Sequence, residues 1–450
     1  MKKSNRKMAL KHKTVSLDEA LRNAVSLHQQ GHARQAAQHY GAILEVAPRH
    51  PDALHYLGVA QHQLGDRAAA LRLIGQALDV APDYVDARNN LGNVQKEMGQ
   101  FAEAEASYRA VIAARPDFAL AHNNLGVVLR GQDRYEEAVS CYRQAVSLAP
   151  DFAQGWLNLG HVLKKTDQPH EALTAYRNAV MLTPDSIEGH RNLARALVAS
   201  GRNEEALEVY RQWQEIEPDN PVIAHHIAGC KGDGAPERAS DAYVQKTFNG
   251  FAGCFDEVLA KLEYCAPQMC GEMVAALLGA PAQALDVLDA GCGTGLCAPF
   301  LRPYARRLDG VDLSPGMLAK ATERGGYDGL HEAELVAWLN GHAGAYDVIV
   351  SADTLCYFGA LEAAMLGAGA ALRDGADFVF TVEETRDAAA FPTFLLHPHG
   401  RYSHTEAYVR QTLQQAGLEV VELRRITLRQ EANKPVAGLL VGARKARSPR

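Results

Sequence analysis

An acidic residue followed by three glycines at alternate positions stands in the stretch DAGCGTG, residues 289–295. The apolar run before it predicts a buried strand, and the residues after it predict a helix. Gly291, Gly293 and Gly295 let the backbone approach a ligand closely, because no Cβ intervenes, and the start of a helix offers free N–H groups. A dinucleotide fingerprint would need a glycine where this chain has Leu296, and no P-loop Lys-Ser/Thr follows. The stretch therefore predicts a different nucleotide-like ligand.

A second predicted strand ends in Asp312, about 20 residues after the first glycine, where a carboxylate can accept both ribose hydroxyls. With the pattern D-x-G-x-G-x-G, this resembles class I S-adenosylmethionine-dependent methyltransferases. The resemblance implies S-adenosyl-L-methionine as cofactor and Glu334 near its adenine amino group, although Ala333-Glu334 replaces the more usual Gly-Asp. The aromatic-rich segment that precedes the domain adds Tyr243 as a candidate lid residue. The candidate cofactor residues are Asp289, Gly291, Cys292, Gly293, Gly295, Asp312, Leu313, Met317, Glu334, Leu335, Ser351, Asp353 and Tyr243.

Candidates for the methyl-acceptor side follow the fourth and fifth predicted strands. The segment LLHPHGRYSHTEAYV is rich in His, Arg and Tyr. His404 could act as a base near neutral pH, Tyr402 could orient an acceptor, and Asp353 ends the fourth strand. Arg401 and Arg429 could hold a carboxylate. A loop histidine and structural salt bridges are the alternative. The fourth strand ends in Ala-Asp-Thr-Leu rather than Asn-Pro-Pro-Tyr, which disfavours base amines and glutamine as acceptors.

The first half of the chain repeats with a period of 34 residues. Leu-Gly pairs recur on this period, as do a small residue followed four later by Tyr or Ile, and a closing proline. Glycine inside a helix costs about 1 kcal/mol relative to alanine, so close approach of a second helix is expected there. These columns resemble the tetratricopeptide repeat, with six units over residues 17–220. The Leu-Gly glycines are Gly58, Gly92, Gly126 and Gly160.

Such arrays present the first helix of each pair on a concave face. One position of successive units holds asparagine, which can donate to and accept from a peptide backbone, and the column resembles the asparagine ladder of O-GlcNAc transferase. A neighbouring stripe is cationic and would favour an acidic protein or peptide. Alternatively, the asparagines satisfy neighbouring helices and the cations form a solvated face. The candidate partner-binding residues are Asn90, Asn124, Asn158, Asn192, Lys96, Arg130 and Lys164.

Composition restricts the remaining possibilities. The chain has 450 residues and a formal net charge of −7, so no nucleic-acid partner is expected. No apolar run is long enough for a membrane span. The 8 cysteines show no zinc-ligand spacing, which predicts no metal site. Scattered thiols of this kind favour a reducing, cytoplasmic location.

Together these patterns predict a multidomain chain. We expect a disordered basic leader (1–16), an all-α tetratricopeptide-repeat solenoid (17–220), a linker (221–240) and an α/β Rossmann-like class I methyltransferase domain (241–450). Its sheet should be mostly parallel and seven-stranded, with an antiparallel last strand. The combination resembles a bacterial group of tetratricopeptide-repeat methyltransferases. The repeats would recruit a protein substrate or partner. Two alternatives are a small-molecule methyltransferase that the repeats target to a complex, and a scaffold whose methyltransferase-like domain is not catalytic.

Overall fold

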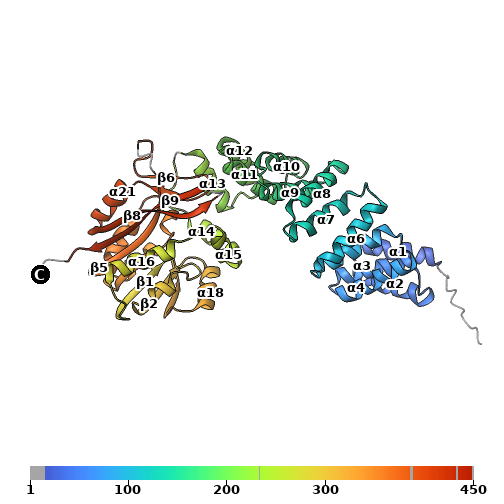
Figure 1. Ribbon diagram of the computed structural model, residues 1–450, viewed down its shortest axis with the longest axis horizontal. Helices are drawn as coiled ribbons and strands as arrows, with labels where there is room; N and C mark the ends of the chain where they lie inside the picture. The colour runs from blue at the N-terminus through green and yellow to red at the C-terminus, as the bar shows by residue number, and fades with distance from the viewer. Residues whose placement is uncertain (1–15, 233, 386–388, 432–433, 448–450) are drawn as a thin grey trace, which may run out of the picture. The chain divides into compact units, whose positions relative to one another are not determined.

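The computed structural model describes residues 16–232, 234–385, 389–431 and 434–447. Within it the chain divides into two compact units, Met1–Gly189 and His190–Arg450 (Figure 1). The expected leader lies outside the described residues except for Ser16, whose hydroxyl accepts a hydrogen bond from the backbone N–H of Glu19 and caps the first helix.

The first unit consists of antiparallel helix pairs, which confirms the predicted repeat architecture. The second helix of each repeat ends shortly before the closing proline of that repeat, because proline cannot continue the backbone hydrogen bonds of a helix. The first helices also contact one another in succession and so line one side of the array. The helices are α1 (Leu17–Gln29), α2 (Ala33–Val46), α3 (Pro51–Gln63), α4 (Arg67–Val80), α5 (Val85–Glu97), α6 (Phe101–Ala114), α7 (Ala119–Gly131), α8 (Tyr135–Leu148), α9 (Ala153–Lys165) and α10 (Pro169–Leu182).

The glycine column of the repeats marks the closest approach of paired helices, as predicted. A Cβ on Gly126 would lie 2.8 Å from Cε1 of Tyr142, and a Cβ on Gly160 would lie 2.5 Å from Cε1 of Tyr176. Both tyrosines are buried. The loss of helix propensity at each glycine is therefore offset by close packing of an aromatic ring.

The turn inside each repeat needs a residue in the left-handed region. Gly65 and Gly99 adopt φ values of 89° and 74° there. Asp133 and Asp167 take the same position at 59° and 55°, which aspartate tolerates better than most residues. This explains why two units lack the glycine that the others carry.

The second unit begins with helices that continue from the array. They are α11 (Ile187–Ala199), which spans the boundary, then α12 (Asn203–Ile216) and α13 (Pro221–Lys231). α13 occupies much of the segment expected to be a linker. Asn220 caps its start through the N–H of Val222, and it ends at Gly232, whose φ is 75°.

The methyltransferase fold predicted for the rest of the chain is confirmed (Figure 1). Its strands follow the order β3-β2-β1-β4-β5, all parallel, and β9 then pairs antiparallel with both β5 and β8. The strands are β1 (Leu285–Ala290), β2 (Ala305–Asp312), β3 (Gly329–Glu332), β4 (Tyr346–Ser351), β5 (Leu372–Glu384), β8 (Leu418–Glu431) and β9 (Lys434–Lys445).

A short hairpin that the sequence does not predict extends the edge of the sheet. It is formed by β6 (Phe394–Leu396) and β7 (Tyr402–His404), and β7 pairs with the last two residues of β5. The remaining helices are α14 (Asp241–Phe251), α15 (Phe255–Lys261), α16 (Ala266–Leu278), α17 (Ala298–Leu301), α18 (Pro315–Arg324), α19 (Leu335–Gly341), α20 (Glu362–Ala371) and α21 (Glu406–Gln415).

The strand order reverses between β1 and β4, since β1 leads to β2 on one side and β4 follows on the other. Open α/β sheets bind ligands at the carboxyl ends of strands beside such a point. The glycine loop follows β1, Asp312 ends β2 and Asp353 follows β4, so the topology brings the predicted site residues to this one edge.

Candidate functional site

The glycine loop after β1 has the backbone conformation that its glycines predict. Gly291, Gly293 and Gly295 have φ values of 82°, 54° and 86°, which a residue with a Cβ rarely adopts. A Cβ on Gly291 would lie only 2.2 Å from Oγ1 of Thr354, whereas a Cβ on Gly293 would meet no atom within 4 Å. Gly291 is thus required by packing against the loop after β4, and Gly293 presents bare backbone to open space.

Asp312 is held in place by the loops on either side of it. Its Oδ2 accepts a hydrogen bond from the N–H of Gly293 at 2.9 Å, and its Oδ1 accepts one from Ser314 at 2.8 Å. Burial raises the pKa of Asp312, and these backbone donors oppose the rise. Each carboxylate oxygen keeps a second lone pair, so two further hydroxyl donors can be bound.

Asp289 is buried and has one oxygen without a partner. Tyr327 donates to its Oδ2 at 2.6 Å, while Oδ1 has no hydrogen-bond partner among the described residues. Burial raises the pKa of Asp289 to about 7, Tyr327 lowers it and Asp312 raises it further. Tyr327 also packs against Gly295. Sequence reasoning missed Tyr327, because no local motif links it to a carboxylate on another strand.

Glu334 begins α19 as its N-cap. Its Oε2 accepts from the N–H of Ala337 at 2.8 Å, which is the usual role of a capping carboxylate. Its Oε1 is buried and has no hydrogen-bond partner in the described part of the chain, although Nη1 of Arg238 lies 3.6 Å away. Buried polar atoms are nearly always satisfied. The free oxygens of Asp289 and Glu334, together with the bare backbone at Gly293, therefore fit a nucleoside ligand with several hydrogen-bond donors.

The other predicted cofactor residues occupy supporting positions. Ser351 donates to the carbonyl of Ala290 at 2.9 Å and so joins β4 to β1. The side chains of Cys292, Met317 and Leu335 are buried and Leu313 is half-buried. These residues shape the loop ends that carry Asp289, Asp312 and Glu334.

Helices α14 and α15 are tied to the same edge of the sheet. Thr294 of the glycine loop donates to Asp256 at 2.6 Å, and Arg324 also pairs with Asp256. Asn249 accepts from Ser314 at 2.7 Å. Tyr243, the predicted lid residue, is itself buried, and its ring lies 4.0 Å from that of His225. Contact with the loops is made by Asp256 and Asn249, which the sequence analysis did not single out.

A buried cluster of opposite charges lies at the carboxyl ends of β4 and β5, beside the glycine loop. Arg429 donates to Asp353 at 2.8 Å and to Glu431 at 2.7 Å, and it also pairs with Glu383. Arg401 pairs with Glu383 at 2.6 Å and with Glu431 at 2.5 Å. Burial raises the pKa of Glu383, but Arg401 and Arg429 outweigh it and hold that pKa at about 2. Both arginines, expected as anchors for an external carboxylate, are engaged by carboxylates of the chain itself.

His404 and Tyr402, the candidate base and orienting residue, are fully buried. His404 donates from Nε2 to the carbonyls of Phe358 and Gly359, at 2.8 and 3.1 Å. Tyr402 donates to the carbonyl of Pro236 at 2.8 Å. In this arrangement both side chains attach β7 to neighbouring backbone, and neither presents a free surface to an acceptor.

The β6–β7 hairpin is joined to α13 by two histidines. His225 donates to the carbonyl of Gly400 and His226 to that of Pro398, each at 2.9 Å. A Cβ on Gly229 would lie 2.5 Å from the carbonyl oxygen of His397. α13 thus packs directly on the turn that precedes Arg401 of the charge cluster.

The buried histidines predict a loss of stability in mild acid. Burial lowers the pKa of His226 to about 4, and it lowers that of His404 to about 4 as well, from 6.5. Between pH 6.5 and 4 the unfolded chain binds protons that the folded chain does not. The free energy of unfolding of the second unit should therefore fall as pH falls, by at most about 1.4 kcal/mol per pH unit for each histidine. Urea denaturation at a series of pH values measures this slope.

The control is His226→Gln, because an amide can still donate to the carbonyl of Pro398 but does not titrate. This variant should show a shallower slope over the same range. An unchanged slope would contradict the assignment to His226.

The asparagines of the repeats bond mainly to one another. Asn90 donates to His55 at 2.9 Å, Asn124 to Asn93 at 3.1 Å, and Asn158 to Asn123 at 2.9 Å. The resulting row runs along the first helices α3, α5, α7 and α9. Asn192 lies in α11, in the second unit. Of the cationic stripe, Lys96 and Arg130 are half-buried and Lys164 is exposed.

Because Asn158 is buried and bonded, its replacement by alanine should destabilise the first unit. The change leaves Oδ1 of Asn123 without its donor, and an unsatisfied buried group costs about 1–3 kcal/mol. Thermal unfolding followed by circular dichroism measures the change. Lys165→Ala on the same helix is the control and should have almost no effect, since Lys165 is exposed. Equal stability of Asn158→Ala and wild type would favour a purely ligand-binding role.

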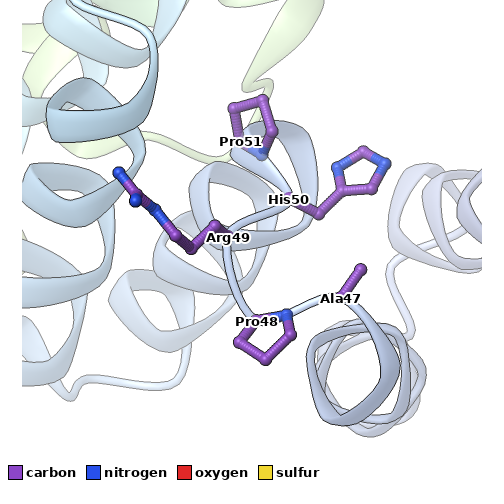
Figure 2. Close-up of a pocket in the computed structure, with 5 residues that line it drawn as sticks. All are labelled: Ala47, Pro48, Arg49, His50 and Pro51. Atoms are coloured by element: carbon purple, nitrogen blue, oxygen red, sulfur yellow. The ribbon is translucent and has the colours of Figure 1, made fainter.

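A shallow hollow of about 530 Å³ lies at the turn between α2 and α3, lined by residues 47–51. Figure 2 shows the side chains of Arg49 and His50 pointing in different directions. The hollow therefore lacks the converging polar groups of a small-molecule site. Among the described residues, no helix is long and apolar enough to cross a membrane, and no group of three or more His, Cys, Asp or Glu could hold a metal ion.

Family models match both halves of the chain. Residues 262–423 match a methyltransferase domain. Residues 21–72, 89–153 and 163–228 match tetratricopeptide repeats. Among solved structures, the type IV pilus biogenesis factor PilW is 18% identical, with a TM-score of 0.43, and the likeness covers 46% of this chain and 96% of that one.

Curated relatives match within a short part of their length. Methyltransferase-like protein 27 of Homo sapiens is 37% identical over 98 residues, which are 22% of this chain and 39% of the relative. Malonyl-[acyl-carrier protein] O-methyltransferase of Pectobacterium atrosepticum is 37% identical over 92 residues, 20% of this chain and 34% of the relative. The matched segment of this chain thus covers well under half the length of either relative.

Proposed function

We propose that this chain, which carries tetratricopeptide repeats and a methyltransferase domain, is an S-adenosylmethionine-dependent methyltransferase whose repeats recruit a protein substrate or partner. One observation carries the proposal for the cofactor. At the switch point of the sheet, acidic side chains and bare glycine backbone follow the ends of neighbouring strands, and Asp289 and Glu334 each have a buried oxygen without a hydrogen-bond partner among the described residues. Such oxygens suit a ligand rich in hydroxyl and amino groups.

Each of these residues has a distinct role in the proposed site. Asp312 would bind the ribose hydroxyls, because backbone N–H groups already fix both of its oxygens. Oε1 of Glu334, which accepts no hydrogen bond from the described residues, would accept from the adenine amino group, and Asp289 would face the cationic end of the ligand through Oδ1. When bound, S-adenosylmethionine supplies an electrophilic methyl group on a positively charged sulfur.

The repeats supply the second part of the proposal. Repeat arrays expose a continuous concave surface for polypeptides, and the first helices that would line it include Lys96, Arg130 and Lys164. One matched relative is named for a substrate borne on a carrier protein, which supports an acceptor borne on a protein. Since the asparagines largely bond to each other, we assign recognition chiefly to the cations, with an acidic protein as partner.

The experiment uses the full chain, methyl-labelled S-adenosylmethionine and cell extract, followed by separation of macromolecules from small molecules. We expect label in the protein fraction. A triple Lys96→Glu, Arg130→Glu, Lys164→Glu variant should bind cofactor normally but label protein at least about 10-fold less, because like charges repel across an interface. Label confined to small molecules would contradict protein recruitment, and absence of cofactor binding would contradict the enzyme assignment.

A further inference from the structure

The charge cluster that contains Asp353 carries more negative than positive charge. Its carboxylates are Asp353, Glu383 and Glu431, and its cations are Arg401 and Arg429. His399 lies nearby, but its side chain is exposed, so solvent screens any charge that it carries. With its carboxylates ionised, the cluster holds three negative and two positive charges. It therefore disfavours a second anion.

The two arginines are already engaged by carboxylates of the cluster. Arg429 is 3% exposed, and its three donor nitrogens are each directed to a different carboxylate of the cluster. Arg401 bonds to Glu383 and Glu431. Drawing either guanidinium toward an external carboxylate would leave buried carboxylates unpaired, which is strongly unfavourable.

Asp353 is held so that one oxygen is bonded and the other is not. Arg429 donates to Oδ2, whereas Oδ1 is buried and has no partner among the described residues. The backbone of Asp353 is in the left-handed region, with φ 56°, and its N–H donates to Oγ1 of Thr381 at 2.8 Å. Several contacts therefore stabilise a conformation that is costly for a non-glycine residue, beside the loop in which Thr354 donates to Gly291.

Two tyrosines lie near this carboxylate. Tyr264 and Tyr357 are both half-buried. Burial, and then the charge of Asp353, raises the pKa of the Tyr264 hydroxyl, and burial raises that of Tyr357, so both hydroxyls remain neutral. The surroundings of Asp353 thus hold further carboxylates, Glu383 and Glu431, and these favour a cationic or hydrogen-donating group over an anion.

We propose that the methyl acceptor is a group that carries a hydrogen, an amine or a hydroxyl rather than a carboxylate, and that Oδ1 of Asp353 binds this hydrogen. This inference rests on the proposed function. In the transfer, the acceptor atom forms a bond to the methyl carbon with its lone pair, and the carbon–sulfur electron pair stays on the departing thioether. The acceptor loses one proton, which Oδ1 of Asp353 takes. Burial, the main cause, raises the pKa of Asp353, which favours this role.

The test uses the full chain saturated with S-adenosylhomocysteine and two probes of equal size, benzylamine and benzoate, in isothermal titration calorimetry. We expect benzylamine to bind at least about 10-fold more tightly, because a buried negative charge attracts one probe and repels the other. Asp353→Asn should remove most of this preference. Asp347→Asn, at the other end of β4 and paired with Arg373, is the matched control and should keep the preference.

Each outcome decides the proposal. Preference for benzoate, equal binding or no binding of either probe would overturn the acceptor class. A benzylamine preference that survives in Asp353→Asn would overturn the role of Asp353. Failure to bind S-adenosylhomocysteine would instead overturn the proposed function on which the inference rests.

A second measurement uses the labelled products of the natural reaction. Methyl esters of carboxylates are cleaved by mild alkali to volatile methanol, whereas methyl groups on nitrogen or in ethers resist it. We expect alkali-stable label, and release of the label as methanol would overturn the proposal.

Discussion

The Asp312→Ala variant is expected to bind S-adenosylmethionine at least about 100-fold more weakly than the unaltered chain. Hydrogen bonds to a charged group contribute about 1.5–3 kcal/mol each, and the carboxylate offers two to the ribose. The substitution also releases the N–H groups of Gly293 and Ser314, which Asp312 holds at 2.9 and 2.8 Å. Isothermal titration calorimetry measures the affinity directly.

Asp309→Asn provides the matched control on the same strand. Asp309 is also buried on β2, three residues before the end of the strand, but it pairs with Arg307 and, among the described residues, accepts no hydrogen bond from the glycine loop. Its variant should bind the cofactor within about twofold of wild type. Unchanged affinity in Asp312→Ala would remove the central cofactor contact from the proposed function.

The second large effect is expected in the repeats, from Tyr142→Ala. Tyr142 is fully buried against Gly126, and truncation of a buried aromatic residue costs about 3–5 kcal/mol through lost burial and the remaining cavity. Repeat arrays distribute stability over neighbouring units. The loss should therefore appear as a lower unfolding midpoint of the first unit, measured by urea denaturation.

Two tyrosine-to-phenylalanine variants separate ring packing from hydrogen bonding. The hydroxyl of Tyr142 is buried and has no partner among the described residues, so Tyr142→Phe should be neutral or stabilising. Tyr108 occupies the same repeat position but donates to Asn93 at 2.7 Å, so Tyr108→Phe should cost about 1 kcal/mol. The opposite order of the two variants would contradict this account of the glycine column.

The sequence predicted those parts of the fold that local patterns determine. The 34-residue period fixed the helix pairs, because each repeat meets the same packing requirement between glycine and aromatic ring. Alternating glycines located the loop after β1. The β6–β7 hairpin escaped prediction because its strands have three residues each, too few to establish a period.

Within the candidate site, residues adjacent to a motif were predicted and distant partners were not. Asp289 and Asp312 follow from spacing, but the Tyr327 hydroxyl that bonds to Asp289 lies on a different segment. Arg401 and Arg429 were predicted to hold a carboxylate, but the carboxylates that they bind come from the loop after β4, from β5 and from the end of β8. Only the folded chain reveals that these arginines neutralise internal carboxylates.

The packing of α13 on the turn of the β6–β7 hairpin restricts where the number of repeats can change during evolution. This helix is attached to the turn before Arg401 by His225, His226 and Gly229. We therefore expect the methyltransferase domain and the final helices of the array to be inherited together. We expect that repeats added or deleted on the N-terminal side of Gly189 leave the contact between α13 and this turn intact. A breakpoint within 221–231 would instead separate two surfaces that must evolve together. Variation in repeat number among relatives should therefore be concentrated toward the N-terminal side.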